Sequence, residues 1–408
     1  MPISIFVRGA SLKKGQLPKF TARRNYCSQR IPLEKFSDIR PYLDKEVPEV
    51  MVRFAASPLL ISFVRETTWP TCPGILAKPL DFFIKRFLKR RLKKIRTIDD
   101  FQQKIVADVL LRRVLSSSTN GLTSSGIEKL PQDKCYIFIS NHRDIVLDSA
   151  FLNYQLHFHG HKVPFIAFGD NLLINNLVED LIRINRAFIV KRDLPPRAQF
   201  KELVHLSEYI NQLRLDGNHF WIAQKEGRAK DGIDSTNPAI IKMFYLSERK
   251  KQPDFSAFIN SCNIVPVALS YEKDPCDRLK GWELYRKLKR GEHKKKRNED
   301  FISMAAGILG DKGRVHISVG QPLNGQYNDD EEVAQAINQA IHQLYHLWPS
   351  NYIAYDEVYG TKKYSNRYSI EEKENFLMRY ERVNRKIRPI ILKIYSNPVL
   401  SAEKSSTD

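Results

Sequence analysis

The 408-residue sequence lacks any run of about 18 or more uncharged apolar residues, so it predicts no membrane-spanning helix. Cysteine is scarce and scattered, and no Cys-x-x-Cys pair suggests a zinc or redox site. The five cysteines therefore favour reduced thiols in a cytosolic protein. Residues 1–30 contain no acidic residue. This absence suits an organellar presequence, although a flexible basic arm is the simpler interpretation.

Basic charge, by contrast, is abundant. The chain has 66 Lys and Arg residues against 46 Asp and Glu, a net charge of +20. Such an excess favours an anionic partner, which could be nucleic acid, an acidic membrane surface, a phosphorylated metabolite or an acidic carrier protein. The hydrophobic content of 42% is that of a folded protein with one large domain or two to three smaller units.

Two segments concentrate this basic charge. From Gly74, apolar residues recur at helical spacing up to Ile95, and lysines and arginines occupy the remaining positions. This basic amphipathic helix could lie in the headgroup layer of an anionic membrane or pack on the core with a solvated charged face. The second segment, 287–297, is expected to be a solvated loop or an anion-binding patch.

Apolar strand-like runs alternate with helical ones between Pro131 and Leu323. This alternation predicts an α/β fold with a largely parallel central sheet flanked by helices. The expected strands are 136–140, 163–167, 187–190, 219–223, 264–270 and 315–319, and the expected helices between them are 146–156, 172–184, 198–215 and 238–246. The chain is expected to divide into a basic N-terminal arm with short helices (1-73), a basic helical region (74-130), the α/β domain (131-329) and a C-terminal helical region (330-408).

Several details of the flanking regions are also predicted. Pro58 should interrupt a helix over 47–65, and a second helix is expected over 99–115. The polar spacer 116–126 is typical of a domain boundary. Further helices are expected over 330–347 and in the charged tail 369–393.

The segment 135–149, CYIFISNHRDIVLDS, brings a histidine to the end of a predicted buried strand, followed closely by two carboxylates. A neighbouring carboxylate can fix the tautomer of His142 and make the ring a general base. For His142 to contact Asp148, the histidine must lie in the turn before the helix. Asp144 is then the natural cap of that helix and Asp148 the better orienting group. His142-Arg143-Asp144 also matches the start of a protein-kinase catalytic loop, but the other kinase motifs are missing.

Four segments in the α/β region resemble the motifs of the glycerolipid acyltransferases that act on glycerol-3-phosphate or lysophosphatidate, and they occur in the same order. The first is NHRDIVLD, with Asp148 six residues after His142 where the family has five. The second is 188–192, FIVKR, which contains one extra residue. The third is Glu226-Gly227-Arg228, without the family's spacer residue but with Lys230 two positions later. The fourth is the Val-Pro-Val of 265–267.

The resemblance implies a fatty acyl transfer from acyl-CoA or acyl carrier protein to a hydroxyl of a phosphorylated glycerol acceptor, without a metal or bound cofactor. His142 would be the base, with Asp148 and Asp144 as its neighbouring acids. Arg192, Glu226, Gly227, Arg228 and Lys230 would form the acceptor site, with the cations on the phosphate and Glu226 anchoring the loop. The enzyme would be cytoplasmic and peripherally bound to the anionic surface of the inner (plasma) membrane.

Two alternatives stay open. The chain could be a non-catalytic basic protein that binds anionic lipid or nucleic acid, although no nucleic-acid module is visible and nucleic acid is the less favoured partner. The histidines at 157, 159 and 161 have an alternating spacing that could suit a metal, but no cysteine or acid nearby completes a ligand set.

Overall fold

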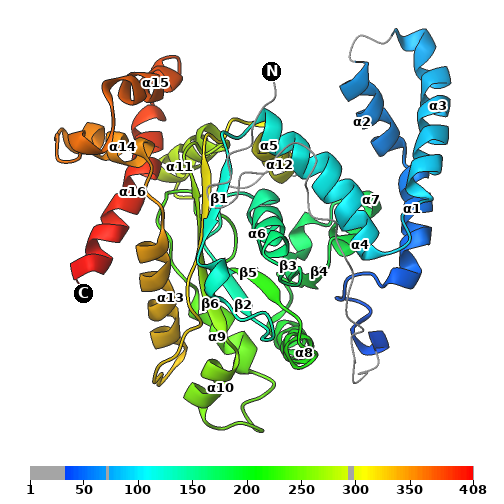
Figure 1. Cartoon of the computed structure of the whole chain (residues 1–408), viewed down its shortest axis with the longest axis horizontal. Coiled ribbons are helices and arrows are strands. Elements are labelled where there is room, and N and C mark those ends of the chain that lie inside the picture. Colours follow the sequence, from blue (N-terminus) through cyan, green and yellow to red (C-terminus); the bar gives the residue numbers. More distant parts are fainter. Residues whose placement is uncertain (1–32, 70–72, 293–297, 408) are drawn as a thin grey trace. The chain divides into compact units, whose positions relative to one another are not determined.

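The computed structural model describes residues 33–69, 73–292 and 298–407 (Figure 1). The predicted N-terminal basic arm lies outside these residues. The described chain forms two compact units, the first made of residues 111–164 and 203–407, and the second of residues 33–110 and 165–202. The units therefore alternate along the chain, whereas the sequence suggested four successive regions.

The first unit is built on five strands. Their order is β1 (Leu122–Ser125), β7 (Val315–Val319), β6 (Ile264–Tyr271), β2 (Ile137–Ser140) and β5 (Phe220–Ala223). All neighbours are parallel except β6 and β7. Every residue of β2 and β6 is buried, as expected for strands covered on both faces. The predicted α/β class with a largely parallel sheet is confirmed.

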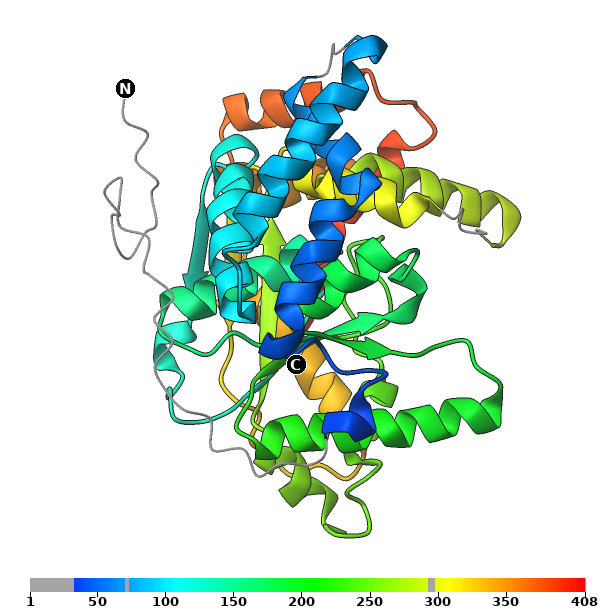
Figure 2. The same ribbon diagram turned by 90° about the vertical axis from the view of Figure 1, so that its right-hand side faces the viewer.

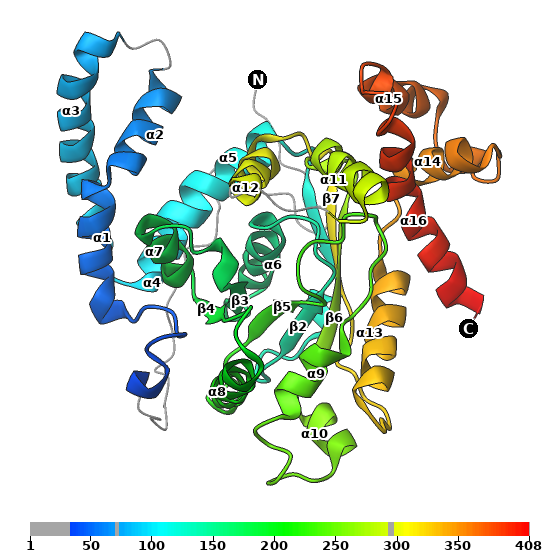
Figure 3. The same ribbon diagram turned by 180° about the vertical axis from the view of Figure 1, so that it is seen from behind.

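Helices cover both faces of this sheet. α6 (Leu147–Phe158) lies on one face and α13 (Asp330–Leu344) on the other (Figures 1 and 3). α6 is anchored by Phe151, whose ring packs 6.3 Å from that of Tyr271 on β6. The remaining helices of this unit are α5 (Arg112–Ser117), α9 (Pro238–Tyr245), α10 (Phe255–Ser261), α11 (Asp277–Arg290), α12 (Glu299–Leu309), α14 (Pro349–Tyr359), α15 (Ile370–Glu381) and α16 (Arg388–Thr407), while α8 (Pro196–Leu215) joins the two units along the chain.

Within the first unit, the C-terminal helices contact the rest of the fold through a buried carboxylate at the start of α11. The hydroxyls of Tyr380 and Tyr395 donate to Asp277 Oδ2 at 2.6 and 3.0 Å. Phe376 and Ile391 pack in the same buried cluster. The tail predicted to be helical over 369–393 forms two helices, α15 and α16, with a break between them.

The second unit has its own core. It contains α1 (Val47–Ala56), α2 (Pro58–Thr68), α3 (Gly74–Leu92), α4 (Ile98–Phe101), a π-helical segment (Gln102–Leu111), β3 (Phe165–Gly169), α7 (Asn176–Ile184) and β4 (Ala187–Val190). β3 and β4 pair in parallel. Val50, Phe54, Leu92 and Phe101 are buried together in this core. The helix break at Pro58 is confirmed: Ser57 Oγ caps α2 by accepting from Leu60 N at 3.4 Å.

Within the described residues, no helix alone has the length and apolar composition to cross a membrane. One bent pair, Asp44–Ala56 with Pro58–Glu66, meets these two criteria together across a 59° bend.

Two local predictions need correction, the first in whole and the second only for residues 287–290, which are helical. The polar spacer 116–126 contains β1, which pairs with β7 from Leu122↔Val315 to Ser125↔Ser318. Because β1 has only one apolar residue and its pairing partner lies almost 200 positions away, the local pattern gave no strand signal. The basic run that starts at Lys287 begins inside α11, which continues to Arg290; residues 293–297 lie outside the described residues.

Candidate active site

His142 lies in the turn between the end of β2 at Ser140 and the start of α6 at Leu147, as predicted. The main chain on either side is fixed to the loop after β5. Ala229 N donates to His142 O at 2.8 Å, and Gln224 N donates to Ser140 O at 2.8 Å. The turn therefore sits at the carboxyl end of parallel strands, where sites of α/β proteins gather.

The His142 ring meets Asp148, the carboxylate that the sequence favoured. The distance between His142 Nδ1 and Asp148 Oδ2 is 2.8 Å, and the two side chains are 13% and 0% exposed. An ionised carboxylate can only accept, so Nδ1 carries the proton and Nε2 keeps its lone pair. Within the described residues Nε2 has no hydrogen-bond partner, and the ring makes an edge contact with Trp221 at 5.8 Å. The arrangement leaves one basic nitrogen accessible.

Asp148 is held by four donors. Its Oδ2 accepts from His142 and from the amides of Arg143 at 2.6 Å and Asp144 at 2.9 Å, while its Oδ1 accepts from the Tyr271 hydroxyl at 2.7 Å. Burial on its own would raise the pKa of Asp148, but the hydrogen bond and charge of His142 and the other donors outweigh it, and the pKa is lowered. Asp148 is therefore ionised at neutral pH although it is fully buried.

Asp144 caps α6, which begins at Leu147, one residue later than the sequence suggested. Its Oδ1 accepts from the amides of Val146 at 2.9 Å and Leu147 at 2.8 Å. Its Oδ2 is buried and has no hydrogen-bond partner among the described residues. Gly307 of α12 lies directly against this oxygen, so that a side chain at 307 would collide with it. Burial, and then the negative charge of Asp148, raises the pKa of Asp144.

The raised pKa of Asp144 predicts the behaviour of Asp144→Asn. A group whose pKa is raised by folding contributes stability below its unfolded pKa of about 3.9, and this contribution is lost as pH rises through the folded pKa. At neutral pH the buried charge therefore costs stability. Asparagine keeps the Oδ1 cap, so we expect a free energy of unfolding at pH 7 that is unchanged or up to about 1 kcal/mol higher, measured by urea unfolding. Acyl transfer should fall by less than about tenfold.

Asp234 holds the residues on both sides of His142. Its Oδ2 accepts from Arg143 Nη2 at 2.6 Å and from Asn141 Nδ2 at 3.3 Å, and all three side chains are buried. Asn141 is also fixed to Leu269 of β6, accepting from its amide at 2.7 Å and donating to its carbonyl at 3.0 Å. Sequence reasoning missed this network, because Arg143 was considered only within the rejected kinase motif and nothing local marks Asp234.

The loop 226–230 supplies cations near the histidine. Gly227 has a φ of +71°, which favours glycine, and both Glu226 and Gly227 are exposed. The Arg228 guanidinium lies close enough to Asp144 to act against the rise of its pKa. Arg228 Nη1 is buried with no hydrogen-bond partner among the described residues. Arg228 thus carries an uncompensated donor beside the His142 turn.

The other two predicted cations are placed differently. The Lys230 ammonium forms an ion pair with Glu283 of α11, so its charge is already neutralised. Arg192 belongs to the second unit, where its amide donates to Asp170 Oδ2 at 3.2 Å. The first unit therefore brings together His142, Asp148, Asp144 and Arg228, and a role for Arg192 stays a prediction.

Two histidines of the cluster 157–161 make contacts of another kind. His159 Nδ1 lies 2.8 Å from Gln155 O, and the His161 ring packs against those of Tyr136 and His219. In the part of the chain that the structure describes, no group of three or more His, Cys, Asp or Glu side chains could hold a metal ion.

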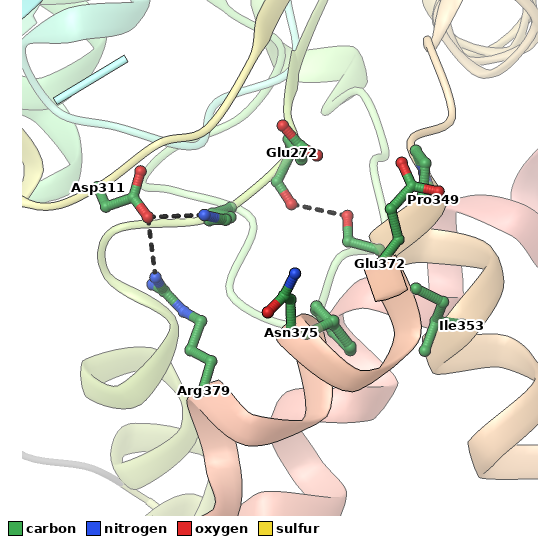
Figure 4. Close-up of a pocket in the computed structure, with 10 residues that line it drawn as sticks. Glu272, Asp311, Pro349, Ile353, Glu372, Asn375 and Arg379 are labelled. Atoms are coloured by element: carbon green, nitrogen blue, oxygen red, sulfur yellow. Dashed lines mark hydrogen bonds and ion pairs between the residues drawn. The ribbon is translucent and has the colours of Figure 1, made fainter. Parts of the chain in front are cut away.

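A separate cavity of about 340 Å³ lies beside the C-terminal helices (Figure 4). Its charged groups are matched with one another: Asp311 pairs with Lys273 at 2.8 Å and with Arg379 at 3.6 Å. The Glu272 carboxylate pairs with Arg314 at 2.8 Å. None of the predicted site residues lines this cavity, which is bounded by Glu272, Lys273, Asp311, Pro349, Ser350, Ile353, Glu372, Asn375, Phe376 and Arg379.

Residues 121–270 match the family model described as Acyltransferase. The matched segment runs from the residue before β1 to the penultimate residue of β6 and contains His142, Asp148 and the loop 226–230. This match, together with the relatives named below, supports the resemblance to the glycerolipid acyltransferases that the motifs suggested.

Among characterised proteins, the chain is similar to the dihydroxyacetone phosphate acyltransferases of Bos taurus and Homo sapiens. Each is 25% identical over 210 residues, which are 50% of this chain and 29% of the relative. The match thus spans less than a third of the length of these relatives. A solved structure, the 1-acyl-sn-glycerophosphate (LPA) acyltransferase PlsC from Thermotoga maritima, aligns with 14% identity and a TM-score of 0.33 over 73% of this chain and 95% of that one.

Proposed function

We propose that the chain is an O-acyltransferase of phospholipid synthesis with His142 as its general base. It would move a fatty acyl group from acyl-CoA or acyl carrier protein to a hydroxyl of a phosphorylated glycerol, glycerol-3-phosphate or lysophosphatidate. The observation that carries this proposal is the 2.8 Å contact between an accessible imidazole and a buried carboxylate with a lowered pKa, inside an acyltransferase domain.

The chemistry follows from this pair. His142 Nε2 removes the hydroxyl proton as the acceptor oxygen attacks the thioester carbonyl, and main-chain amides hold the oxyanion that forms. The intermediate then expels the thiolate, and the imidazolium returns its proton to it. Asp148 stabilises the imidazolium through Nδ1 and keeps the ring in the required tautomer. A base in this position accelerates such a step about 10²- to 10⁴-fold.

Arg228 is the favoured phosphate ligand of the acceptor. Its Nη1 is a buried donor without a partner among the described residues, and a guanidinium suits a phosphate oxygen. Gly227 next to it permits close approach of the main chain. Glu226 would anchor the loop, and the role of Arg192 as a second phosphate ligand stays a prediction from the motif alone.

Arg228→Gln is therefore expected to raise the KM for the phosphorylated acceptor about 10- to 100-fold, because a hydrogen bond to a charged group is lost. Lys230→Gln is the matched control. Its ammonium already pairs with Glu283, so the KM should change less than about threefold. Steady-state kinetics with varied acceptor check both values, and an equal effect of the two variants would contradict the assignment.

We also propose that the enzyme is cytoplasmic and peripherally bound to the inner (plasma) membrane. The membrane contact in this proposal rests on α3, on which Phe82, Phe83 and Phe87 are exposed among lysines and arginines. The sequence left open whether the apolar face of this helix packs on the core, and among the described side chains of α3 only Ile84 and Leu92 are buried. Exposed aromatics beside cations suit the headgroup layer of an anionic membrane.

The function is tested with the purified chain, a panel of acyl donors and a panel of acceptors, with lipid products identified by mass spectrometry. The acceptors should include glycerol-3-phosphate, lysophosphatidate and dihydroxyacetone phosphate, the last because of the names of the relatives. Transfer to a phosphorylated acceptor that depends on His142 supports the proposal. Salt-sensitive binding to anionic vesicles without any transfer would favour a non-catalytic lipid-binding protein instead.

A further inference from the structure

α12 has two contrasting faces. On one face Ser303 and Gly307 are buried, and Gly307 lies against Asp144. The opposite face exposes Phe301, Ile302 and Leu309 by 58, 51 and 75%. At about 100° per residue these three side chains fall on one side of the helix. The outer face of α12 is therefore apolar although it is exposed.

The end of α11 adds cations to the same surface. Leu288 is 76% exposed in the last turn of α11, where Lys287, Lys289 and Arg290 are exposed around it. Arg286 of α11 pairs with Glu299 of α12 at 3.6 Å, so the end of one helix meets the start of the other (Figures 1 and 2). We call Leu288, Phe301, Ile302 and Leu309, with these three cations, the hairpin surface.

We propose that the hairpin surface inserts into the headgroup layer of an anionic bilayer. A single exposed leucine needs no explanation, but large apolar side chains grouped beside cations are typical of helices that lie in a membrane interface. A soluble acidic carrier protein would complement the cations. A bilayer complements both groups at once, because apolar side chains enter the acyl boundary while lysine and arginine meet lipid phosphates.

This contact would set the position of the candidate active site. The inner face of α12 lies against Asp144, two residues from His142, so insertion of the outer face brings the imidazole close to the lipid headgroups. A lysolipid acceptor has its phosphate and free hydroxyl at that level. This last step rests on the proposed function, whereas insertion itself does not.

Insertion is tested with a fluorescent probe on one introduced cysteine at a time, with Cys262 and Cys276 retained because both are buried. An NBD group is attached to Ile302→Cys or Leu309→Cys in a chain that also carries Cys27→Ser, Cys72→Ser and Cys135→Ser. Ile370→Cys is the control, because Ile370 is 80% exposed on α15 of the same unit. With phosphatidylglycerol vesicles that contain doxyl-labelled lipid, we expect a blue shift and quenching at 302 and 309 but not at 370. No change at 302 and 309 on vesicles that the chain binds would overturn the proposal.

A second measurement compares the triple variant Phe301→Ser, Ile302→Ser, Leu309→Ser with the control Ile370→Ser, Met378→Ser. The triple variant should bind phosphatidylglycerol vesicles about 10-fold or more weakly, because it no longer transfers three apolar side chains from water into the bilayer. The control variant should bind the vesicles as tightly as the wild type. Circular dichroism and thermal unfolding should be unchanged in both variants, which shows that the fold is intact, and transfer to soluble glycerol-3-phosphate should also be unchanged.

The outcomes separate the two proposals. Unchanged vesicle binding by the triple variant overturns the hairpin surface, whatever the activity. Weakened vesicle binding in a protein that never transfers an acyl group upholds the surface and overturns the proposed function. Loss of binding to acyl carrier protein, with vesicle binding intact, would show that the surface recognises the carrier and would also overturn the proposal.

Discussion

Alanine in place of His142 is expected to reduce acyl transfer about 10²- to 10⁴-fold, the contribution of a positioned base to such a step. The acceptor hydroxyl would then have to lose its proton to water. The fold should survive, because Asp148 keeps its three other donors, the amides of Arg143 and Asp144 and the hydroxyl of Tyr271. Initial rates at saturating donor and acceptor, together with thermal unfolding followed by circular dichroism, measure both effects.

His159→Ala is the matched control for this experiment. Its Nδ1 lies 2.8 Å from Gln155 O at the end of α6, where it has no part in the proposed chemistry. Transfer by this variant should be unchanged. Full activity of the His142 variant would remove the proposed mechanism, and unfolding of that variant would show that the imidazole has a structural role as well.

The second large effect is expected for Asp148→Asn. An asparagine can keep its oxygen toward His142 and the two amides, with its NH₂ toward the Tyr271 hydroxyl, so the tautomer of His142 can be retained. What is lost is the negative charge that stabilises the imidazolium. We expect transfer to fall at least about 100-fold and the free energy of unfolding at pH 7 to fall by about 1–3 kcal/mol.

The pH dependence of stability gives this prediction a direction. Because folding lowers the pKa of Asp148, its contribution is present above the unfolded pKa of about 3.9 and is lost as pH falls through the folded pKa. The difference between the wild type and Asp148→Asn in urea unfolding should therefore be large at pH 7 and shrink below about pH 4. Tyr271→Phe removes one neutral donor and should cost only about 1 kcal/mol, with a much smaller loss of activity.

The relative loss of acyl transfer in Asp148→Asn and Asp144→Asn is the sharpest check of which carboxylate orients His142. The structure gives Asp148 the contact with His142 and gives Asp144 the helix cap. If Asp144→Asn were the more severe variant in transfer, the orienting carboxylate would have been wrongly chosen, and the electrostatic effect of Arg228 on Asp144 would become the feature to test next.

The six apolar strands were predictable from their runs of largely apolar residues. β4, for example, has the predicted bounds Ala187–Val190. β2 and β6 are buried throughout, whereas β3 is only partly buried. β1 was not predictable, because its polar residues are held at the sheet by β7 rather than by their own periodicity. The start of α7 was also misjudged. The helix begins at Asn176, four residues after the expected residue 172, because Asn175 caps it by accepting from Val178 N at 3.0 Å.

At the candidate site, the contact between His142 and Asp148 followed from helix geometry and the end of a strand. The surroundings did not. Asp234, Tyr271 and Gly307 approach the turn from segments 92 or more positions away in the sequence, and their residue types have no local signal. Lys230 looked like a phosphate ligand only because Glu283, which neutralises it, is 53 positions away.

The way in which the two units share the chain has a consequence for biosynthesis. As the polypeptide leaves the ribosome, the first unit emerges in two parts, separated by a segment of the second unit. This segment contains β3, α7 and β4. The earlier part of the first unit, with β1, β2 and α6, must wait for the later part, with β5, β6 and β7, before its sheet can form. Neither unit can be completed before residue 202 has been synthesised. No single truncation can release either of them, and the second could be isolated only by excising residues 111–164 and joining 110 to 165 through a linker.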